Sequence, residues 1–154
     1  MKTETPITKE LDALGIPYRL HLHPQPLRSL AQAARERGLR PEQIVRSLLF
    51  RLEGERYILV MMPGDRQVDW KKLRRFLGVS RITTADREEV QRVTGYPPGG
   101  VSPIGLPSSI RILADRRIQD EDTLSMGAGI PNAGLILSRA DLLKAVKPEF
   151  GDFC

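Results

Sequence analysis

The chain has 154 residues, 40% of them hydrophobic and 28% charged, which is typical of one folded, soluble domain and excludes a disordered segment. Its net charge of +5, carried mostly by arginine, permits a nucleic-acid partner without establishing one. No apolar run is long enough to span a membrane, and residues 1–10 lack the apolar core of a secretory signal, so we expect a cytoplasmic protein.

The first predicted element is a helix that Pro6 can begin and Gly15 can end, with apolar residues at helical spacing between them. An alternating stretch at 18–23 predicts a short strand, which the following prolines stop. Ser29 is placed to cap a second helix, and Gly38 to end it.

Two stronger strand patterns follow, and the short "EGE" between them predicts an antiparallel hairpin. Asp69 can then cap a helix. The ranges from the hairpin onward are strands at 44–52 and 56–62, a helix at 70–78, a short strand at 80–85, a helix at 86–95, strands at 109–114, 122–129 and 133–138, and a helix at 139–146.

Strands interleave with helices, but several connections are too short to join parallel neighbours. No internal repeat and no linker divides the chain. We therefore predict a single α+β domain over 1–154, with a mixed, largely antiparallel, barrel-like sheet surrounded by helices.

The stretch "TGYPPGGVSPIGL", residues 94–106, is called the glycine loop below. Adjacent Gly99 and Gly100 allow positive φ angles and close approach to another molecule, while Pro98 and Pro103 stiffen the flanks. Backbone N–H groups in such a loop can hold a carboxylate or a developing oxyanion. A tight structural turn explains the same glycines equally well.

Side chains that suggest a metal site or a nucleophile are scarce. His21 and His23 lie two apart, on one face of the predicted strand, but no third histidine and no well-placed cysteine completes a ligand set. One of them could instead be a general base, or both could be polar residues at a rim. Cys154 is the only cysteine, and a chain end holds a nucleophile poorly. We expect no metal and no cofactor.

The helix at 70–78 carries several basic residues beside an apolar stripe. It could lie along nucleic-acid phosphates, although such helices more often present a solvated face over a core stripe.

The glycine loop resembles the signature of the YbaK/EbsC-type aminoacyl-tRNA deacylases, the family that includes the editing domain of bacterial prolyl-tRNA synthetases. The likeness covers nearly the whole chain, because weaker matches occur in the family's order. These are "HLHP", "SLAQAARERGLRPEQIVRSLLFR", "ILVMMPGDRQVDWKKLRRFLG" and "GAGIPNAGLILSRADLL".

The resemblance implies a metal-independent hydrolase that cleaves the ester between a wrong amino acid and tRNA, and so protects translation fidelity. By position, the backbone of Gly99 and Gly100 would steady the ester carbonyl. The remaining substrate-binding residues that the resemblance implies are His21, Ser47, Val101, Ser102, Pro103, Gly127 and Asn132.

Two positions depart from the family pattern. Arg46 stands where the family usually has a lysine; it keeps the cation for catalysis or substrate binding but cannot act as a general base. An aspartate of some relatives aligns near Gly134, so that acid is missing, and Asn132 is at best a polar substitute.

The favoured function is a free-standing trans-editing hydrolase that removes Ala, Cys or a similar small residue from tRNA, with tRNA(Pro) the preferred carrier and a prolyl-tRNA synthetase a candidate partner. The alternative is a catalytically silent relative that binds aminoacyl-tRNA or an aminoacyl-adenosine-like ligand. A third option is an interaction domain unrelated to tRNA.

Overall fold

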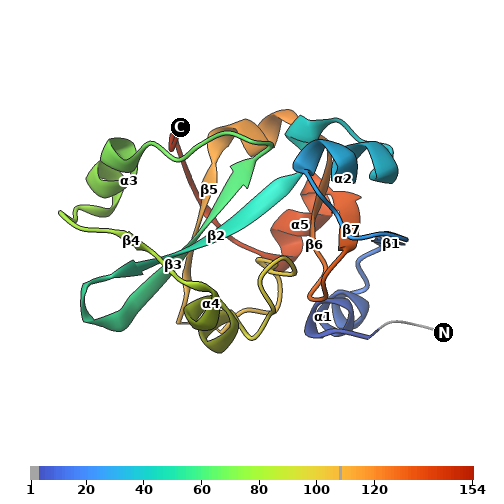
Figure 1. Cartoon of the computed structure of the whole chain (residues 1–154), viewed down its shortest axis with the longest axis horizontal. Coiled ribbons are helices and arrows are strands. Elements are labelled where there is room, and N and C mark those ends of the chain that lie inside the picture. Colours follow the sequence, from blue (N-terminus) through green and yellow to red (C-terminus); the bar gives the residue numbers. More distant parts are fainter. Residues whose placement is uncertain (1–3, 108) are drawn as a thin grey trace.

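Two β-sheets organise the chain in a computed structural model that describes residues 4–107 and 109–154 (Figure 1). One sheet has the strand order β4-β2-β3-β5-β8 and the other β1-β7-β6. The strands are β1 (Arg19–Leu22), β2 (Val45–Leu52), β3 (Arg56–Pro63), β4 (Thr83–Thr84), β5 (Arg111–Asp115), β6 (Thr123–Gly127), β7 (Ala133–Ser138) and β8 (Glu149–Gly151). The helices are α1 (Pro6–Leu14), α2 (Leu30–Arg37), α3 (Trp70–Leu77), α4 (Arg87–Thr94) and α5 (Arg139–Ala145), with 3-10 turns at Pro41–Gln43, Glu53–Glu55 and Arg116–Asp120.

The predicted hairpin of β2 and β3 lies at the centre of the larger sheet. Side chains along each strand alternate between two hydrophobic cores, one on each face. Side chains such as Leu49, Leu59 and Met61 enter the core shared with the smaller sheet. Phe50 and Val60, one residue away, enter a second core under α3 on the opposite face. Because β3 is buried on both faces, its sequence reads as an unbroken apolar run.

The two sheets approach each other where β2 begins, through a single parallel bridge between Ile44 and Ser125. β4 covers the same edge of β2 only at Phe50 and Arg51, further along the strand. Thus the described chain forms a barrel-like pair of sheets with a gap between β2 and β6, and the closed barrel that the prediction allowed is not observed. The mixed, largely antiparallel pairing is confirmed, because four of the six strand pairings in the described chain are antiparallel and the two parallel ones join β5 to β3 and to β8.

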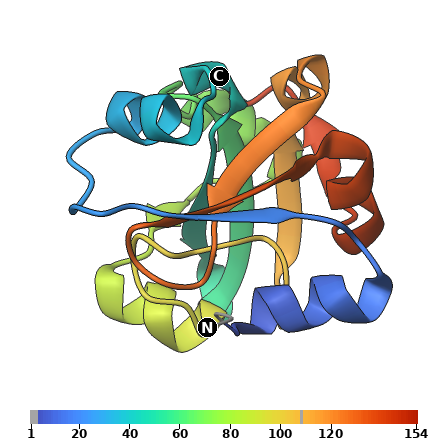
Figure 2. The same cartoon turned by 90° about the vertical axis from the view of Figure 1, so that its right-hand side faces the viewer.

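Helix ends follow the predicted capping residues. The side chains of Ser29 and Asp69 accept hydrogen bonds from the first turns of α2 and α3, and Gly15 and Gly38 adopt the left-handed conformation that ends α1 and α2. Figure 2 shows β1 running between α2 and α1, so the strand holds these helices at opposite ends of the smaller sheet.

One strand was not predicted, and the first residues of the chain lie outside the described part. The short strand β8 was missed, because three residues after the last helix carry no clear alternation. Residues 1–3 of the stretch examined for a secretory signal are outside the described residues. No helix in the described part of the chain is long and apolar enough to cross a lipid bilayer.

Candidate functional site

Two adjoining cavities lie beside the start of β2, the inner one in the gap between the two sheets. The inner cavity, about 210 Å³, is bounded by the start of β2, by the glycine loop and by β6. The outer cavity, about 380 Å³, opens between β2, the glycine loop and the start of α3. Four residues line both cavities, namely Arg46, Ser47, Gly99 and Val101, and all four belong to the predicted site.

Arg46 and Ser47 leave opposite faces of β2, since neighbouring residues of a strand alternate. The Arg46 guanidinium donates from Nε to the carbonyl of Gly64, at 2.6 Å, and from Nη2 to the carbonyl of Arg66. Burial lowers the pKa of Arg46, although a guanidinium stays charged at neutral pH. A fixed cation therefore lies in the common wall.

The Ser47 hydroxyl is buried, and none of the described residues supplies a hydrogen-bond partner for it. A buried hydroxyl without a partner is costly, so such a group in a cavity wall is suited to meet a ligand. No histidine lines either cavity beside it, so the described surroundings do not provide the base that a serine nucleophile needs.

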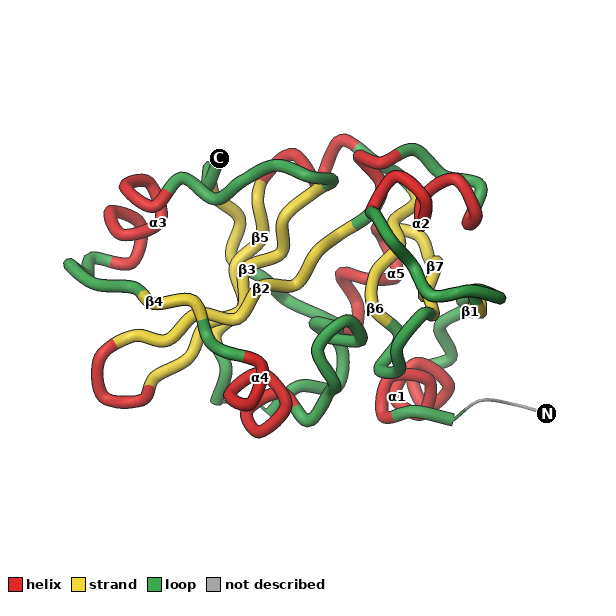
Figure 3. The backbone as a smooth tube through the Cα atoms, in the orientation of Figure 1, coloured by secondary structure: helices red, strands yellow, loops and turns green. Residues whose placement is uncertain are grey.

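The glycine loop leaves α4 as one long connection (Figure 3), and it is tied at several points. Tyr96 is buried and donates from its hydroxyl to the carbonyl of Ile104 at 2.6 Å, which closes the loop on itself. Ser102 is buried and its hydroxyl accepts the N–H of Ile104. Pro103, also buried, and Ser102 therefore shape the loop from behind without lining the two cavities.

The two adjacent glycines have different surroundings. Gly99 has a φ of 87° and lines both cavities. Gly100 is packed so closely on the turn after β6 that a Cβ would lie 2.9 Å from the nitrogen of Ile130. The N–H of Gly100 donates to the carbonyl of Pro97, and its carbonyl accepts from Gly129. Its backbone is thus engaged in fixing the loop.

Gly127, on β6, lines the inner cavity beside the glycine loop. A Cβ at this position would overlap the carbonyl of Val101, so glycine is required for the close approach of strand and loop. The structure therefore brings Gly127 into the same wall as Val101.

Arg37, at the end of α2, is a cavity residue that the sequence analysis missed. It is 9% exposed and lines the inner cavity beside Ala133. Its guanidinium lies against Gly134, where a Cβ would overlap Cζ and Nε. The bare backbone at Gly134 thus leaves the room that Arg37 fills.

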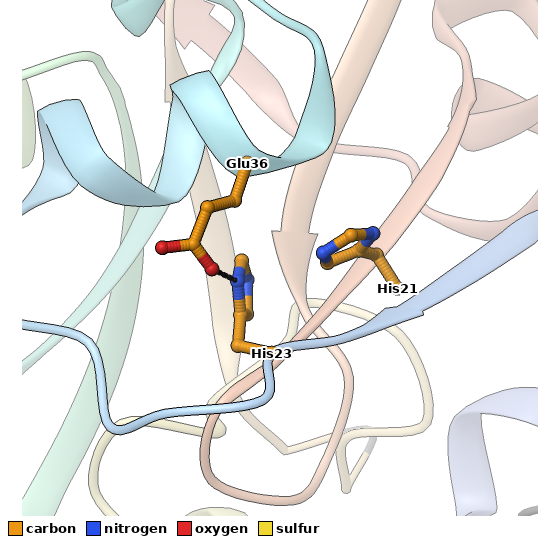
Figure 4. Close-up of side chains that lie close together, drawn as sticks. All are labelled: His21, His23 and Glu36. Atoms are coloured by element: carbon orange, nitrogen blue, oxygen red, sulfur yellow. Dashed lines mark hydrogen bonds and ion pairs between the residues drawn. The ribbon is translucent and has the colours of Figure 1, made fainter.

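The side chains of His21 and His23 point toward α2 and approach Glu36 (Figure 4). One potential metal-ligand atom from each of the three lies within 4.8 Å of the others, so Glu36 supplies a third donor that the sequence analysis did not identify. In the structure, however, Nδ1 of His23 is 2.8 Å from Glu36 Oε1 and Nε2 accepts from Arg37 Nε at 3.0 Å. Both ring nitrogens of His23 are engaged, and a guanidinium lies beside them, which disfavours a cation.

His21 and Asn132, which the family resemblance implies as substrate-binding residues, are not among the residues that line the two cavities. His21 Nε2 is buried and has no hydrogen-bond partner among the described residues. Burial lowers the pKa of His21, and electrostatic interactions with His23 and with the Arg37 cation lower it further. Asn132 is exposed, and its side chain accepts the N–H of Leu27, so it holds the segment after β1.

The outer cavity has a more apolar wall. Trp70, 38% exposed, stands edge-on to Phe50 with the ring centroids 5.4 Å apart, and both line this cavity. An exposed indole beside a cavity can stack with a nucleobase.

A larger hollow, of about 570 Å³, lies elsewhere, between the β2–β3 hairpin and α4. Two pairs of its charged groups already interact, Arg51 with Glu89 and Arg92 with Glu88, and Glu89 also accepts a hydrogen bond from the Tyr57 hydroxyl. We therefore place the candidate site at the paired cavities.

Comparison with known proteins identifies relatives for this architecture. The family model described as the aminoacyl-tRNA editing domain matches residues 24–145. The proline–tRNA ligase of Limosilactobacillus fermentum is 32% identical over 127 residues, which are 79% of this chain and 22% of the ligase. That of Desulforamulus reducens is 34% identical over 105 residues, 68% of this chain and 18% of the ligase. The chain therefore spans about a fifth of the length of these relatives.

Two solved structures match over almost their whole length. Hypothetical protein APE2540 is 29% identical, with a TM-score of 0.86, and the match covers 97% of this chain and 99% of that one. A protein provisionally described as a trans-editing enzyme for prolyl tRNA synthetase is 26% identical, also with a TM-score of 0.86, over 96% and 94% of the two chains.

Proposed function

The chain belongs to the aminoacyl-tRNA editing domain family, related to prolyl-tRNA synthetase editing, and on that premise we propose that it is a free-standing hydrolase of wrongly charged tRNA. Its proposed substrate is Ala, Cys or a similar small amino acid on tRNA(Pro), its proposed partner a prolyl-tRNA synthetase, and its proposed location the cytoplasm. The observation that carries the proposal is the common wall, where Arg46, Ser47, Gly99 and Val101 line both cavities.

Each cavity suits one part of an aminoacyl-adenosine. The outer cavity offers the Trp70 and Phe50 rings to the terminal base. The inner cavity, smaller than the roughly 300–1,000 Å³ of a typical ligand pocket, suits an amino-acid side chain. The ester between these two parts then lies at the common wall, within reach of the Ser47 hydroxyl and the Gly99 backbone.

Electrostatic stabilisation is the proposed source of catalysis. Attack of water on the ester carbon places negative charge on the carbonyl oxygen, and the Arg46 cation and the loop backbone can stabilise it. Among the described residues that line the cavities, Arg46 and Arg37 are the only ionisable ones, so no side chain there is a suitable general base. We propose that the substrate's own groups and the backbone orient the water, without a metal.

The contacts of Arg46 favour one alternative. Because its guanidinium already donates to the carbonyls of Gly64 and Arg66, it could be a structural cation, and the domain a silent binder of aminoacyl-tRNA.

Deacylation of tRNA(Pro) charged with Ala, Cys, Ser or Pro would separate these functions. We expect the wild type to release a wrong amino acid, and Arg46→Ala to reduce the rate about 100-fold, the usual cost of losing one oxyanion-stabilising group. Arg75→Ala, on the exposed side of α3, is the control for lost positive charge. Salt-sensitive tRNA binding with no release from any substrate would establish the silent binder instead.

Gly99→Ala tests the loop. Gly99 and Gly78 both have positive φ, 87° and 67°, and a Cβ on either meets nothing within 4 Å. Alanine therefore strains both positions similarly, but only Gly99 lines the cavities. We expect deacylation to fall at least tenfold in Gly99→Ala relative to Gly78→Ala, and equal rates would exclude the proposed role of Gly99.

A further inference from the structure

We propose that Arg37 makes the inner cavity a subsite for an oxygen acceptor, selecting aminoacyl groups whose side chain ends in a carboxylate or, less strongly, a hydroxyl. This inference rests on the proposed hydrolysis of wrongly charged tRNA and changes its substrate: the inner cavity would favour a small side chain that carries an oxygen over the methyl group of Ala or the thiol of Cys.

Arg37 is a constituent of the cavity wall. It is 9% exposed, at the C-terminal end of α2, and lines the cavity together with Met126 and Gly127. The absence of a side chain at Gly134 makes this position possible, because a Cβ there would overlap the guanidinium. The arginine is therefore held close to the space that a side chain of the substrate would occupy.

The Arg37 guanidinium has more N–H donors than the described residues supply acceptors for. Nε donates to His23 Nε2 and Nη1 to Ser125 Oγ, both at 3.0 Å, and Nη2 makes a long 3.5 Å contact with the carbonyl of Ala133. A guanidinium has five N–H groups, so two remain beyond these three acceptors in the described chain. Buried donors without acceptors are costly, which favours a ligand that supplies oxygen atoms.

All three acceptors are electrically neutral. Among the described residues, no carboxylate lies within ion-pair distance of Arg37, and the nearest acid along the network, Glu36, is separated from it by the His23 ring. Since Arg37 donates to Nε2 of His23, that nitrogen must be unprotonated, so the proton is on Nδ1 and is donated to Glu36. Glu36 thus orients the imidazole and, through it, Arg37.

This environment discriminates between side chains. The pKa of Arg37 is lowered, mainly by burial, while the negative charge of Glu36 partly offsets this effect. The guanidinium nevertheless remains a cation at neutral pH. A carboxylate would form charge-assisted bonds with it, a hydroxyl would form a weaker one, and a methyl group would leave the donors unsatisfied. The α-ammonium of the substrate would be repelled and must point away from Arg37.

Binding of non-hydrolysable analogues tests the inference without depending on turnover. The probes are adenosines whose 3′-amide carries aspartate, serine or 2-aminobutyrate, the last replacing the serine hydroxyl with a methyl group. By titration calorimetry we expect the wild type to bind the seryl analogue at least tenfold more tightly than the 2-aminobutyryl one, and the aspartyl analogue more tightly still. Such a factor is well below the discrimination that buried hydrogen-bonding sites can reach.

Two variants and a control assign the preference to Arg37. Arg37→Leu should remove or reverse it, while Arg37→Lys should keep part of the aspartyl preference. Arg35→Leu, exposed on the same helix, should leave all three affinities unchanged.

Equal binding of the three analogues to the wild type, or an equal loss of all three in folded Arg37→Leu, would refute this inference and leave the proposed function standing. Failure of the wild type to bind any analogue would refute both. If Arg37→Leu does not fold, the wild-type ranking together with Arg37→Lys decides the question.

Discussion

Two charge clusters of this molecule, each containing one fully or nearly buried charged side chain, are arranged in opposite ways. One, here called the clamp, joins Asp115 and Asp152 to Arg117 and Lys72. Every charge in the clamp meets an opposite charge, and Asp115, fully buried, also accepts the N–H of Phe153.

The other, the floor cluster, consists of Glu36, His23, Arg37 and Ser125 beneath the inner cavity. Here the buried guanidinium contacts neutral acceptors only, within the described residues. A paired cluster holds a fold together, whereas a buried cation facing a cavity without a counter-ion is costly to fold and suited to a ligand. We therefore predict that changes in the clamp alter the free energy of unfolding, whereas changes in the floor cluster alter which substrate is bound.

The largest expected effect is on stability, from Asp115→Ala in the clamp. This change removes the acceptor of the Phe153 N–H and leaves the Arg117 cation with one fewer partner. Breaking a buried pair from one side costs about 3 kcal/mol of unfolding free energy, measurable by urea denaturation.

Asp120→Ala is the matched control, because Asp120 is exposed in the 3-10 turn that follows β5. We expect a change in that variant of at most about 0.5 kcal/mol. Folded Asp115→Ala should keep its deacylation rate and analogue affinities, and a selective loss of activity at unchanged stability would contradict the division between the clusters.

The fold was largely predictable from local signals. The hairpin of β2 and β3 has strong alternation and a short turn, and Ser29 and Asp69 mark their helix starts as capping residues do. The division into two sheets was not predictable. The gap between β2 and β6 depends on strands about 80 residues apart in the chain, and no local sequence pattern encodes their relation.

The candidate site was predictable in part. The glycine loop and the family resemblance indicated Ser47 and Gly99, which line the cavities. Arg37 was missed because an arginine near the end of a helix is normally a solvated residue that interacts favourably with the helix dipole. Only the sheet register, which places Gly134 opposite His21 on β1, shows that this arginine has a space to enter.

A smaller effect is expected from Tyr96→Phe in the glycine loop. The hydroxyl of Tyr96 donates to the carbonyl of Ile104, and burial raises the pKa of Tyr96 to about 12. Loss of this bond should lower stability by about 1 kcal/mol and loosen the wall that carries Gly99, so that deacylation slows as well. Tyr18→Phe, which removes a hydroxyl bonded to Asp12 on an exposed part of the surface, should change the rate little. Unchanged turnover in Tyr96→Phe would show that the loop holds its shape without this bond.

The smallest expected effect distinguishes His21, which lies beside the floor cluster, from the clamp by the pH at which each loses stability. Because the pKa of His21 is below its usual 6.5, the folded protein binds a proton there less readily than the unfolded chain. Stability from this group is therefore present above about pH 6.5 and is lost progressively as the pH falls below that value. The pKa of Asp152, held at about 2 by Lys72 and Arg117 against a usual 3.8, makes the clamp lose stability only below about pH 4.

Urea midpoints measured from pH 7.5 to 3 should separate these windows. His21→Leu should lose less stability than the wild type between pH 7.5 and 5, because the ring that resists protonation is gone while Glu36, His23 and Arg37 remain. Asp152→Asn should match the wild type's slope in that range and differ from it only at the acid end. Parallel wild-type and His21→Leu curves down to pH 5 would mean that His21 is protonated as readily in the folded chain as in the unfolded one, and that neither its burial nor the nearby Arg37 cation opposes the proton.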